Sequence, residues 1–117
     1  MLEIQIKRVY EPRSSGDGQR VLVDRVWPRG ISKATLKDAI WLKEIAPSTE
    51  LRKWFDHRAE RWQQFCKRYA AELDRNPDAV AKLRALCARG PVTLLYSARD
   101  PEHNQARALL GYLDEHR

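Results

Sequence analysis

The segment Val21-Leu22-Val23-Asp24-Arg25-Val26-Trp27-Pro28-Arg29-Gly30 carries most of the information about the fold of this chain. Its first half is apolar and β-branched, which predicts a strand over Val21–Val26. Three consecutive apolar residues at its start indicate burial on both faces, as in a parallel sheet. The strand is expected to end at Trp27-Pro28, because proline has no N–H to donate to a sheet ladder.

Two further strands are predicted on either side of this segment. Ile4–Tyr10 alternates with period two, and Val92–Tyr96 is a short apolar run. Pro12–Gly18 is expected to be a loop, since it contains glycine and aspartate, which favour turns.

The rest of the chain has helical periodicity and helix-capping residues. Five helices are predicted. The first two begin after Ser32 and after Ser48, and the third covers about Ala59–Leu73. The last two begin at Asn76-Pro77 and at Asp100-Pro101. Pro47 and Gly90-Pro91 are expected to end the first and fourth of them. Together these elements predict one α/β domain over residues 1–117, with a small, mostly parallel sheet of about three strands and flanking helices. The helical middle segment, Thr35–Arg89, is long for one crossover, so part of it should cover the sheet as a cap.

The net charge of +6 and the pI near 9.6 favour an anionic partner, either a small molecule or a nucleic acid. The basic residues form no run, however, and solvated helix faces produce a similar charge. We expect no membrane partner and a cytoplasmic location, since no apolar stretch approaches the roughly 18 residues of a membrane span and no signal peptide is visible. Cys66 and Cys87 lie in helical patterns and are expected to be buried thiols.

Several classes of site have no support in the sequence. The chain lacks a P-loop, a G-x-G-x-x-G fingerprint and a G-x-S-x-G motif. Its histidines, cysteines and carboxylates have no metal-ligand spacing. We therefore expect neither a cofactor nor a metal.

Reactive side chains instead follow two of the predicted strands, in Asp24–Gly30 and in Ser97–Asn104. Ligands of open parallel sheets bind beyond the carboxyl ends of the strands, so these two loops are expected to form one site. The expected acid–base residues are Asp24, His103 and Asp100, and the expected ligand-binding residues are Arg25, Arg29, Trp27, Tyr96 and Asn104. Structural alternatives remain open: Asp100 as a helix cap, Trp27 as a core residue, and Arg29 in a surface ion pair. His57 and His116 are interpreted as surface residues.

These residues give the chain a resemblance to the DUF488 domain family, in its YeaO-like subgroup. The similarity covers nearly the whole length and rests above all on Asp24-Arg25-Val26-Trp27-Pro28-Arg29-Gly30. It continues through Trp41–Ser48, Trp62 and Val92–Asp100 to His103-Asn104. The resemblance implies a compact α/β domain and a bacterial, cytoplasmic setting, and it implies no particular reaction.

The resemblance also bears on the site. The family marks Ser48 and Arg52 as motif positions, so both are expected to line the site from the helical cap, with a helix cap and a surface ion pair as their alternatives. A Cys-His-Arg pattern is common at the last strand of the wider group. Here that region carries His103-Asn104 and no cysteine, which weakens the case for catalysis.

Two classes of function therefore fit the sequence. One is an enzyme that acts by acid–base chemistry on a phosphorylated, nucleotide-like or nucleic-acid substrate. The other is a non-catalytic module that binds a nucleotide or nucleic acid, with a protein–protein interaction module as a further alternative.

Overall fold

A computed structural model describes residues 3–115, and its framework is a sheet of four parallel strands in the order β1-β4-β2-β3. The strands are β1 (Ile4–Arg8), β2 (Gln19–Leu22), β3 (Ile40–Trp41) and β4 (Val92–Tyr96). The α/β class and the small parallel sheet predicted from the sequence are confirmed. The two-residue strand β3, which pairs with β2, is an addition to the three strands expected.

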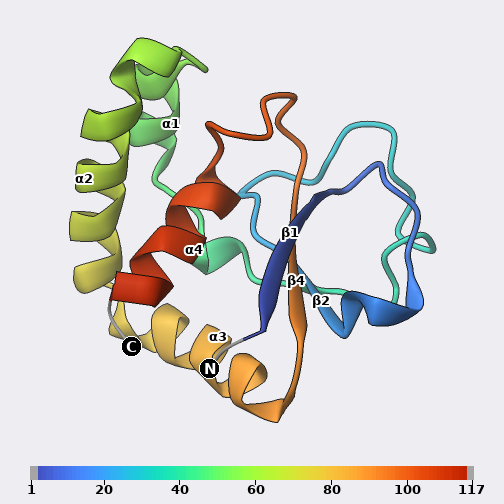
Figure 1. Ribbon diagram of the computed structural model, residues 1–117. Coiled ribbons are helices and arrows are strands. Elements are labelled where there is room, and N and C mark those ends of the chain that lie inside the picture. Colours follow the sequence, from blue (N-terminus) through green and yellow to red (C-terminus); the bar gives the residue numbers. More distant parts are fainter. Residues whose placement is uncertain (1–2, 116–117) are drawn as a thin grey trace.

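Strand β4 lies between β1 and β2, and all five of its residues are buried. Its side chains alternate between two cores, as strand geometry requires. Leu94, like Val21 of β2, belongs to the larger core under the helices, and Leu95, like Leu22, belongs to a smaller core on the opposite face. Figure 1 shows the corresponding layers, with the helices on one side of the sheet and the long loops on the other.

The helices mostly follow the predicted pattern. They are η1 (Ser15–Asp17), η2 (Lys43–Ile45), α1 (Thr49–Phe55), η3 (Ala59–Arg61), α2 (Trp62–Asp74), α3 (Pro77–Arg89) and α4 (Gln105–Glu115). Ser48 caps α1 through a hydrogen bond from the Leu51 N–H to its Oγ (3.1 Å), and Pro77 occupies the first turn of α3, as expected. The turn η1 lies inside the predicted loop. Within residues 3–115, none of the helices has the length and apolar character needed to span a bilayer.

The helix predicted after Ser32 is wrong. Residues 33–38 form turns, and Ile40–Trp41 is the strand β3. Leu36 is buried in the smaller core, with Ala39 packed against it, so the apolar spacing arises because this segment covers the open face of the sheet. A short apolar period does not distinguish these two arrangements.

Two element boundaries also differ from the prediction. Strand β2 ends at Leu22 rather than Val26, because the residues after Val23 turn away to contact other segments. Helix α4 begins at Gln105 rather than at Asp100-Pro101. Asn104 accepts the Arg107 N–H (2.9 Å) at the start of α4, whereas the Asp100 carboxylate accepts the N–H groups of Glu102 and His103 in a turn before it.

Gly18 provides a sharp test of this framework. Its φ is +64°, and a Cβ built there would lie 2.2 Å from the carbonyl oxygen of Pro91, which accepts the Gln19 N–H. We expect Gly18→Ala to lower the free energy of unfolding by about 2 kcal/mol or more, since strain and a backbone clash add. Urea unfolding measures the loss.

Gly16→Ala is the matched control, because nothing lies within 4 Å of a Cβ at that position. It should change the free energy of unfolding by less than about 0.5 kcal/mol. Equal stability of the two variants would contradict the close approach of Gly18 to Pro91.

Candidate functional site

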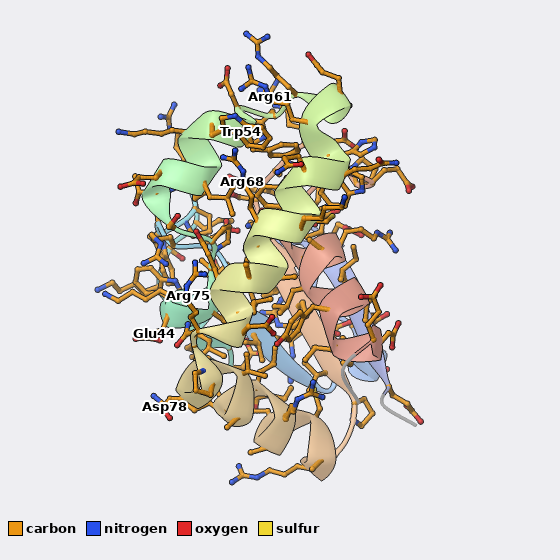
Figure 2. The ribbon with its side chains drawn as sticks, turned by 90° about the vertical axis from the view of Figure 1, so that its left-hand side faces the viewer. Glu44, Trp54, Arg61, Arg68, Arg75 and Asp78 are labelled. Carbon is orange, nitrogen blue, oxygen red and sulfur yellow. The ribbon has the colours of Figure 1, made fainter. Side chains whose placement is uncertain are left out.

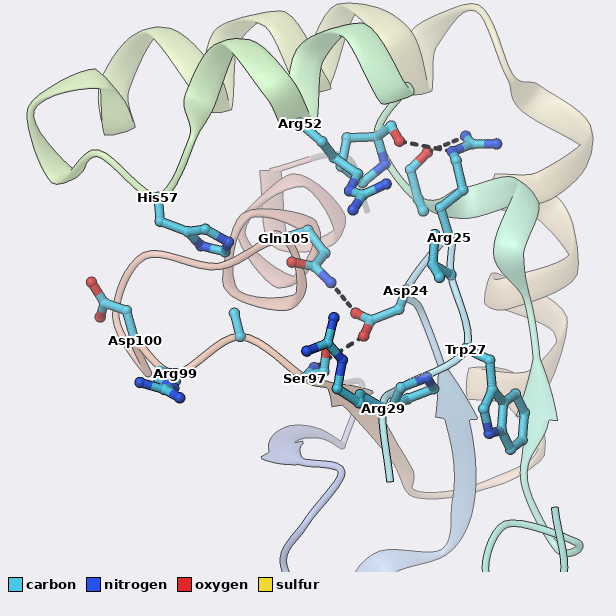
Figure 3. Close-up of a pocket in the computed structure, with 15 residues that line it drawn as sticks. Asp24, Arg25, Trp27, Arg29, Arg52, His57, Ser97, Arg99, Asp100 and Gln105 are labelled. Carbon is cyan, nitrogen blue, oxygen red and sulfur yellow. Dashed lines mark hydrogen bonds between the residues drawn. The ribbon is translucent and has the colours of Figure 1, made fainter. Parts of the chain in front are cut away.

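A pocket of about 570 Å³ lies at the carboxyl ends of β2 and β4, where the sequence predicts the site (Figure 3). The two strands are parallel, so the loops that follow them open at the same edge of the sheet. The C-terminal part of α1 and the first residue of α4 complete the wall. The side chains that define its chemistry are Asp24, Arg25, Arg29, Arg52, His57, Ser97, Arg99, Asp100 and Gln105.

Asp24 is the central residue of the pocket and is 6% exposed. One carboxylate oxygen accepts the backbone N–H of Ser97 (3.1 Å), and the other accepts the side-chain amide of Gln105. The backbone carbonyl of Asp24 also accepts the indole N–H of Trp41 (2.7 Å). Asp24 thus joins the ends of β2 and β4 to β3 and α4.

Burial raises the pKa of the Asp24 carboxyl above its ordinary value of 3.8, because a charge is poorly solvated there. The hydrogen bonds from Ser97 and Gln105 and the positive charge of Arg52 oppose this shift and do not cancel it. Asp24 therefore holds its proton to a higher pH than an exposed aspartate does.

Arg25 lines the pocket, but its guanidinium group is used for structure. It donates to the backbone carbonyls of Pro47 (3.0 Å) and Ala46 (2.9 Å), which precede α1. These bonds tie the segment before α1 to the end of β2. Arg25 therefore shapes the wall and has fewer donors left for a ligand than sequence reasoning assumed.

Three other arginines of the pocket are exposed: Arg29, Arg52 and Arg99. Among residues 3–115, no hydrogen bond or ion pair holds their guanidinium groups. They come from the loop after β2, from α1 and from the loop after β4. Figure 3 shows Arg29 and Arg52 on opposite sides of the Asp24–Gln105 contact. This arrangement places three guanidinium groups around one pocket, where they can bind an anion.

His57 is exposed, as the sequence predicts, and it also lines the pocket, which the sequence does not predict. Helix α1 ends in two consecutive left-handed residues, Asp56 (φ 49°) and His57 (φ 54°), which turn the chain toward the site. Asp and His adopt this conformation more readily than most residues do, so the sequence is compatible with the turn but does not predict it. Arg99 and Gln105 were also missed as candidates, and only the tertiary structure brings them to Asp24.

Several predicted site residues lie outside this pocket. Tyr96 is 3% exposed and belongs to the larger core. Ser48 faces away, where its backbone N–H and hydroxyl donate to the Glu72 carboxylate (2.8 and 2.6 Å). The Trp27 ring packs on Trp41 and in the smaller core, although part of the residue lines the pocket. His116 lies outside the described residues.

His103 and Asn104 line a neighbouring pocket instead. The Nδ1 atom of His103 lies 2.8 Å from the Asp100 carboxylate, and its ring packs edge-on against Trp62. The pKa of the Asp100 carboxyl is lowered, mainly by the hydrogen bond from the Glu102 N–H. Hydrogen bonds from the ring and the N–H of His103 contribute as well. Asp24 and His103, two of the residues expected to carry acid–base chemistry, thus line neighbouring pockets. Within residues 3–115, no group of His, Cys, Asp and Glu is arranged to hold a metal ion.

These features define the class: a small α/β domain with a basic pocket at the carboxyl edge of a parallel sheet. A family model described as "Inactive DUF488-N3 subclade" matches residues 3–117. The chain belongs to this DUF488 family, as the motifs around Asp24 predicted.

The curated relatives match almost end to end. The chain is 45% identical over 112 residues to "Uncharacterized protein YeaO" of Escherichia coli K12, covering 96% of this chain and 97% of that protein. It is 43% identical over 111 residues to "Uncharacterized protein Rv3073c" of Mycobacterium tuberculosis H37Rv, covering 95% of this chain and 93% of that protein. No solved structure matches the chain.

The buried carboxylate predicts a specific pH dependence. Because the pKa of Asp24 is raised on folding, the folded state binds this proton more tightly than the unfolded state. Stability should therefore fall as pH rises from the ordinary value of 3.8 through the raised pKa. In Asp24→Asn this loss should be absent, since the amide can accept from Ser97 and donate to a reoriented Gln105.

Urea unfolding of both proteins from about pH 4 to about pH 8 measures the effect. The free energy of unfolding of Asp24→Asn minus that of the natural chain should rise with pH and then level off. A difference that is constant over the whole range would contradict a raised pKa for Asp24.

Proposed function

We propose that this protein binds a phosphorylated small molecule of nucleotide size in the basic pocket at the end of β2 and β4. The observation that carries the proposal is the set of three exposed guanidinium groups of Arg29, Arg52 and Arg99 around one pocket, none of which makes a hydrogen bond or ion pair with another of residues 3–115. Planar guanidinium groups bind phosphate oxygens in pairs, which suits them to this ligand class.

The dimensions and lining of the pocket support a small ligand. Its volume of about 570 Å³ falls within the usual range for small-molecule sites. Apolar groups of Val26, Pro28 and Ala98 line it beside the arginines, so an uncharged part of the ligand would also find contacts. We also propose a cytoplasmic location, because both cysteines are free thiols and reducing compartments keep them so.

Binding without chemistry fits the pocket better than catalysis does. Both carboxylate oxygens of Asp24 already accept hydrogen bonds, and His103 is engaged with Asp100 in a neighbouring pocket. The matching family model is described as an inactive subclade, which favours the same conclusion.

A nucleic-acid partner has weaker support. Each of the four tryptophans is already packed: Trp27 and Trp41 against each other, Trp62 against phenylalanine rings, and Trp54 against two arginines. On the α1–α2 face, Arg61 and Arg68 lie 5.2 and 4.3 Å from the Trp54 ring centre, so less of this ring is available for base stacking. Figure 2 shows Arg75 continuing this row of arginines and the acidic residues Glu44 and Asp78 beyond it, so the basic stripe on this face ends there.

An enzyme remains a second candidate function because of one observation. Asp24, whose pKa is raised by burial, and His57 line the same pocket. A carboxyl and an imidazole that line one pocket can exchange protons with a bound substrate. Turnover of a bound ligand that is lost in Asp24→Asn while binding is retained would favour this candidate.

A thermal-shift panel of inorganic phosphate, adenosine monophosphate and fructose 6-phosphate near pH 7 tests the proposal. A ligand at about 100 times its Kd should stabilise the fold by about 2.7 kcal/mol, which raises Tm by several degrees. Arg29→Ala should remove most of this shift, because one of the three phosphate-binding groups is lost.

Arg89→Ala is the matched control, since Arg89 is an exposed arginine at the end of α3 that precedes β4, away from the carboxyl edge of the sheet. It should leave the shift intact. The proposal fails if no compound of the panel raises Tm, or if Arg29→Ala and Arg89→Ala give the same shift.

A further inference from the structure

A second pocket, of about 250 Å³, adjoins the first. The two pockets have five lining residues in common: Pro47, Arg52, His57, Ala98 and Gln105. These shared residues lie where the two spaces adjoin. The two spaces form the two halves of one site, with Arg52 and His57 at the junction.

The second half contributes its own cation. Lys53 lines only the second pocket, is exposed, and makes no hydrogen bond or ion pair with any other residue between 3 and 115. Arg52 and Lys53 are consecutive residues of α1, so their side chains leave the helix about 100° apart. Helix α1 can thus present Arg52 to the junction and Lys53 to the second half.

The other charged groups of the second half are already engaged. The His103 ring is paired with Asp100, and the Asp56 carboxylate lies 3.6 Å from Arg58. Among residues 3–115, the cationic groups of the combined site without a hydrogen bond or ion pair are therefore Arg29 and Arg99 in the first pocket, Arg52 at the junction, and Lys53 in the second pocket.

Some of the junction residues are held by contacts to the wall of the first pocket. The Gln105 amide is bonded to the Asp24 carboxylate, and the left-handed turn at the end of α1 brings the backbone of His57 to the junction. Pro47, on the opposite wall, is tied by its carbonyl to Arg25. Two of the residues shared by the pockets, Pro47 and Gln105, are therefore tied to other segments.

We infer that the joined pockets take a ligand with two phosphate groups, one bound in the first pocket, which Arg29 and Arg99 line, and the other near Lys53 in the second pocket, with Arg52 at the junction. This inference rests on the proposed function and specifies its ligand class. Two anionic ends of one molecule would match cations at both ends of the site, and a monophosphate would leave Lys53 unused.

Isothermal titration calorimetry of matched ligand pairs tests the inference. The pairs are adenosine 5′-monophosphate with adenosine 3′,5′-bisphosphate, and fructose 6-phosphate with fructose 1,6-bisphosphate. In at least one pair we expect the bisphosphate to bind about 10-fold tighter, which is the usual value of one charge-assisted contact. Lys53→Ala should bring the ratio of the two affinities close to one.

Lys82→Ala is the matched control, since Lys82 is an exposed lysine on α3 and should leave the ratio unchanged. Monophosphates that bind in an Arg29-dependent manner, without a gain for the bisphosphates, would overturn this inference and leave the proposed function standing. A gain that is unchanged in Lys53→Ala, or reduced equally in Lys82→Ala, would overturn it as well. The proposed function itself fails if neither member of either pair binds.

Discussion

The buried carboxylate of Asp24 is the contact on which the arrangement of this protein depends. Two parallel strands that are far apart in sequence, β2 and β4, end side by side, and Asp24 joins them by accepting the Ser97 N–H. The same carboxylate accepts the amide of Gln105 at the start of α4, and the Asp24 carbonyl accepts the indole N–H of Trp41. The side chain and the backbone carbonyl of this one residue thus accept hydrogen bonds from three segments, and the burial of the carboxylate desolvates its charge.

Arg25 extends this junction to the helical layer. Its two hydrogen bonds to the carbonyls of Ala46 and Pro47 hold the chain where it enters α1. Beyond that point, Ser48 caps α1 and bonds Glu72 of α2. Adjacent residues of one motif thus organise opposite parts of the molecule: Asp24 joins the sheet to α4, and Arg25 joins it to α1. The Asp24-Arg25 pair, which resembles a reactive site in the sequence, therefore also has a structural role.

The pocket lies beside the contacts of Asp24 and Arg25. Where two strand ends, α1 and α4 meet, backbone groups are satisfied by Asp24 and Arg25, and the remaining arginines face solvent without partners among the described residues. Arginines with the same chemistry therefore have different roles in this protein. Arg25 is committed to backbone carbonyls, whereas Arg29, Arg52 and Arg99 remain available for an external anion.

The sequence by itself determined the α/β class, the three main strands, most helices and the position of the pocket, because buried strands, helix caps and prolines leave strong local patterns. Asp24, Arg29 and Asp100 could be placed near a site for the same reason, since they directly follow predicted strands. Only the tertiary structure decided that Leu36 covers the sheet outside a helix, that His57 lines the pocket, and that Tyr96 and Ser48 do not. It also decided that His103 pairs with Asp100 and lines the pocket next to that of Asp24. These outcomes depend on contacts between segments distant in the chain, and local periodicity carries no information about which partners a side chain will meet.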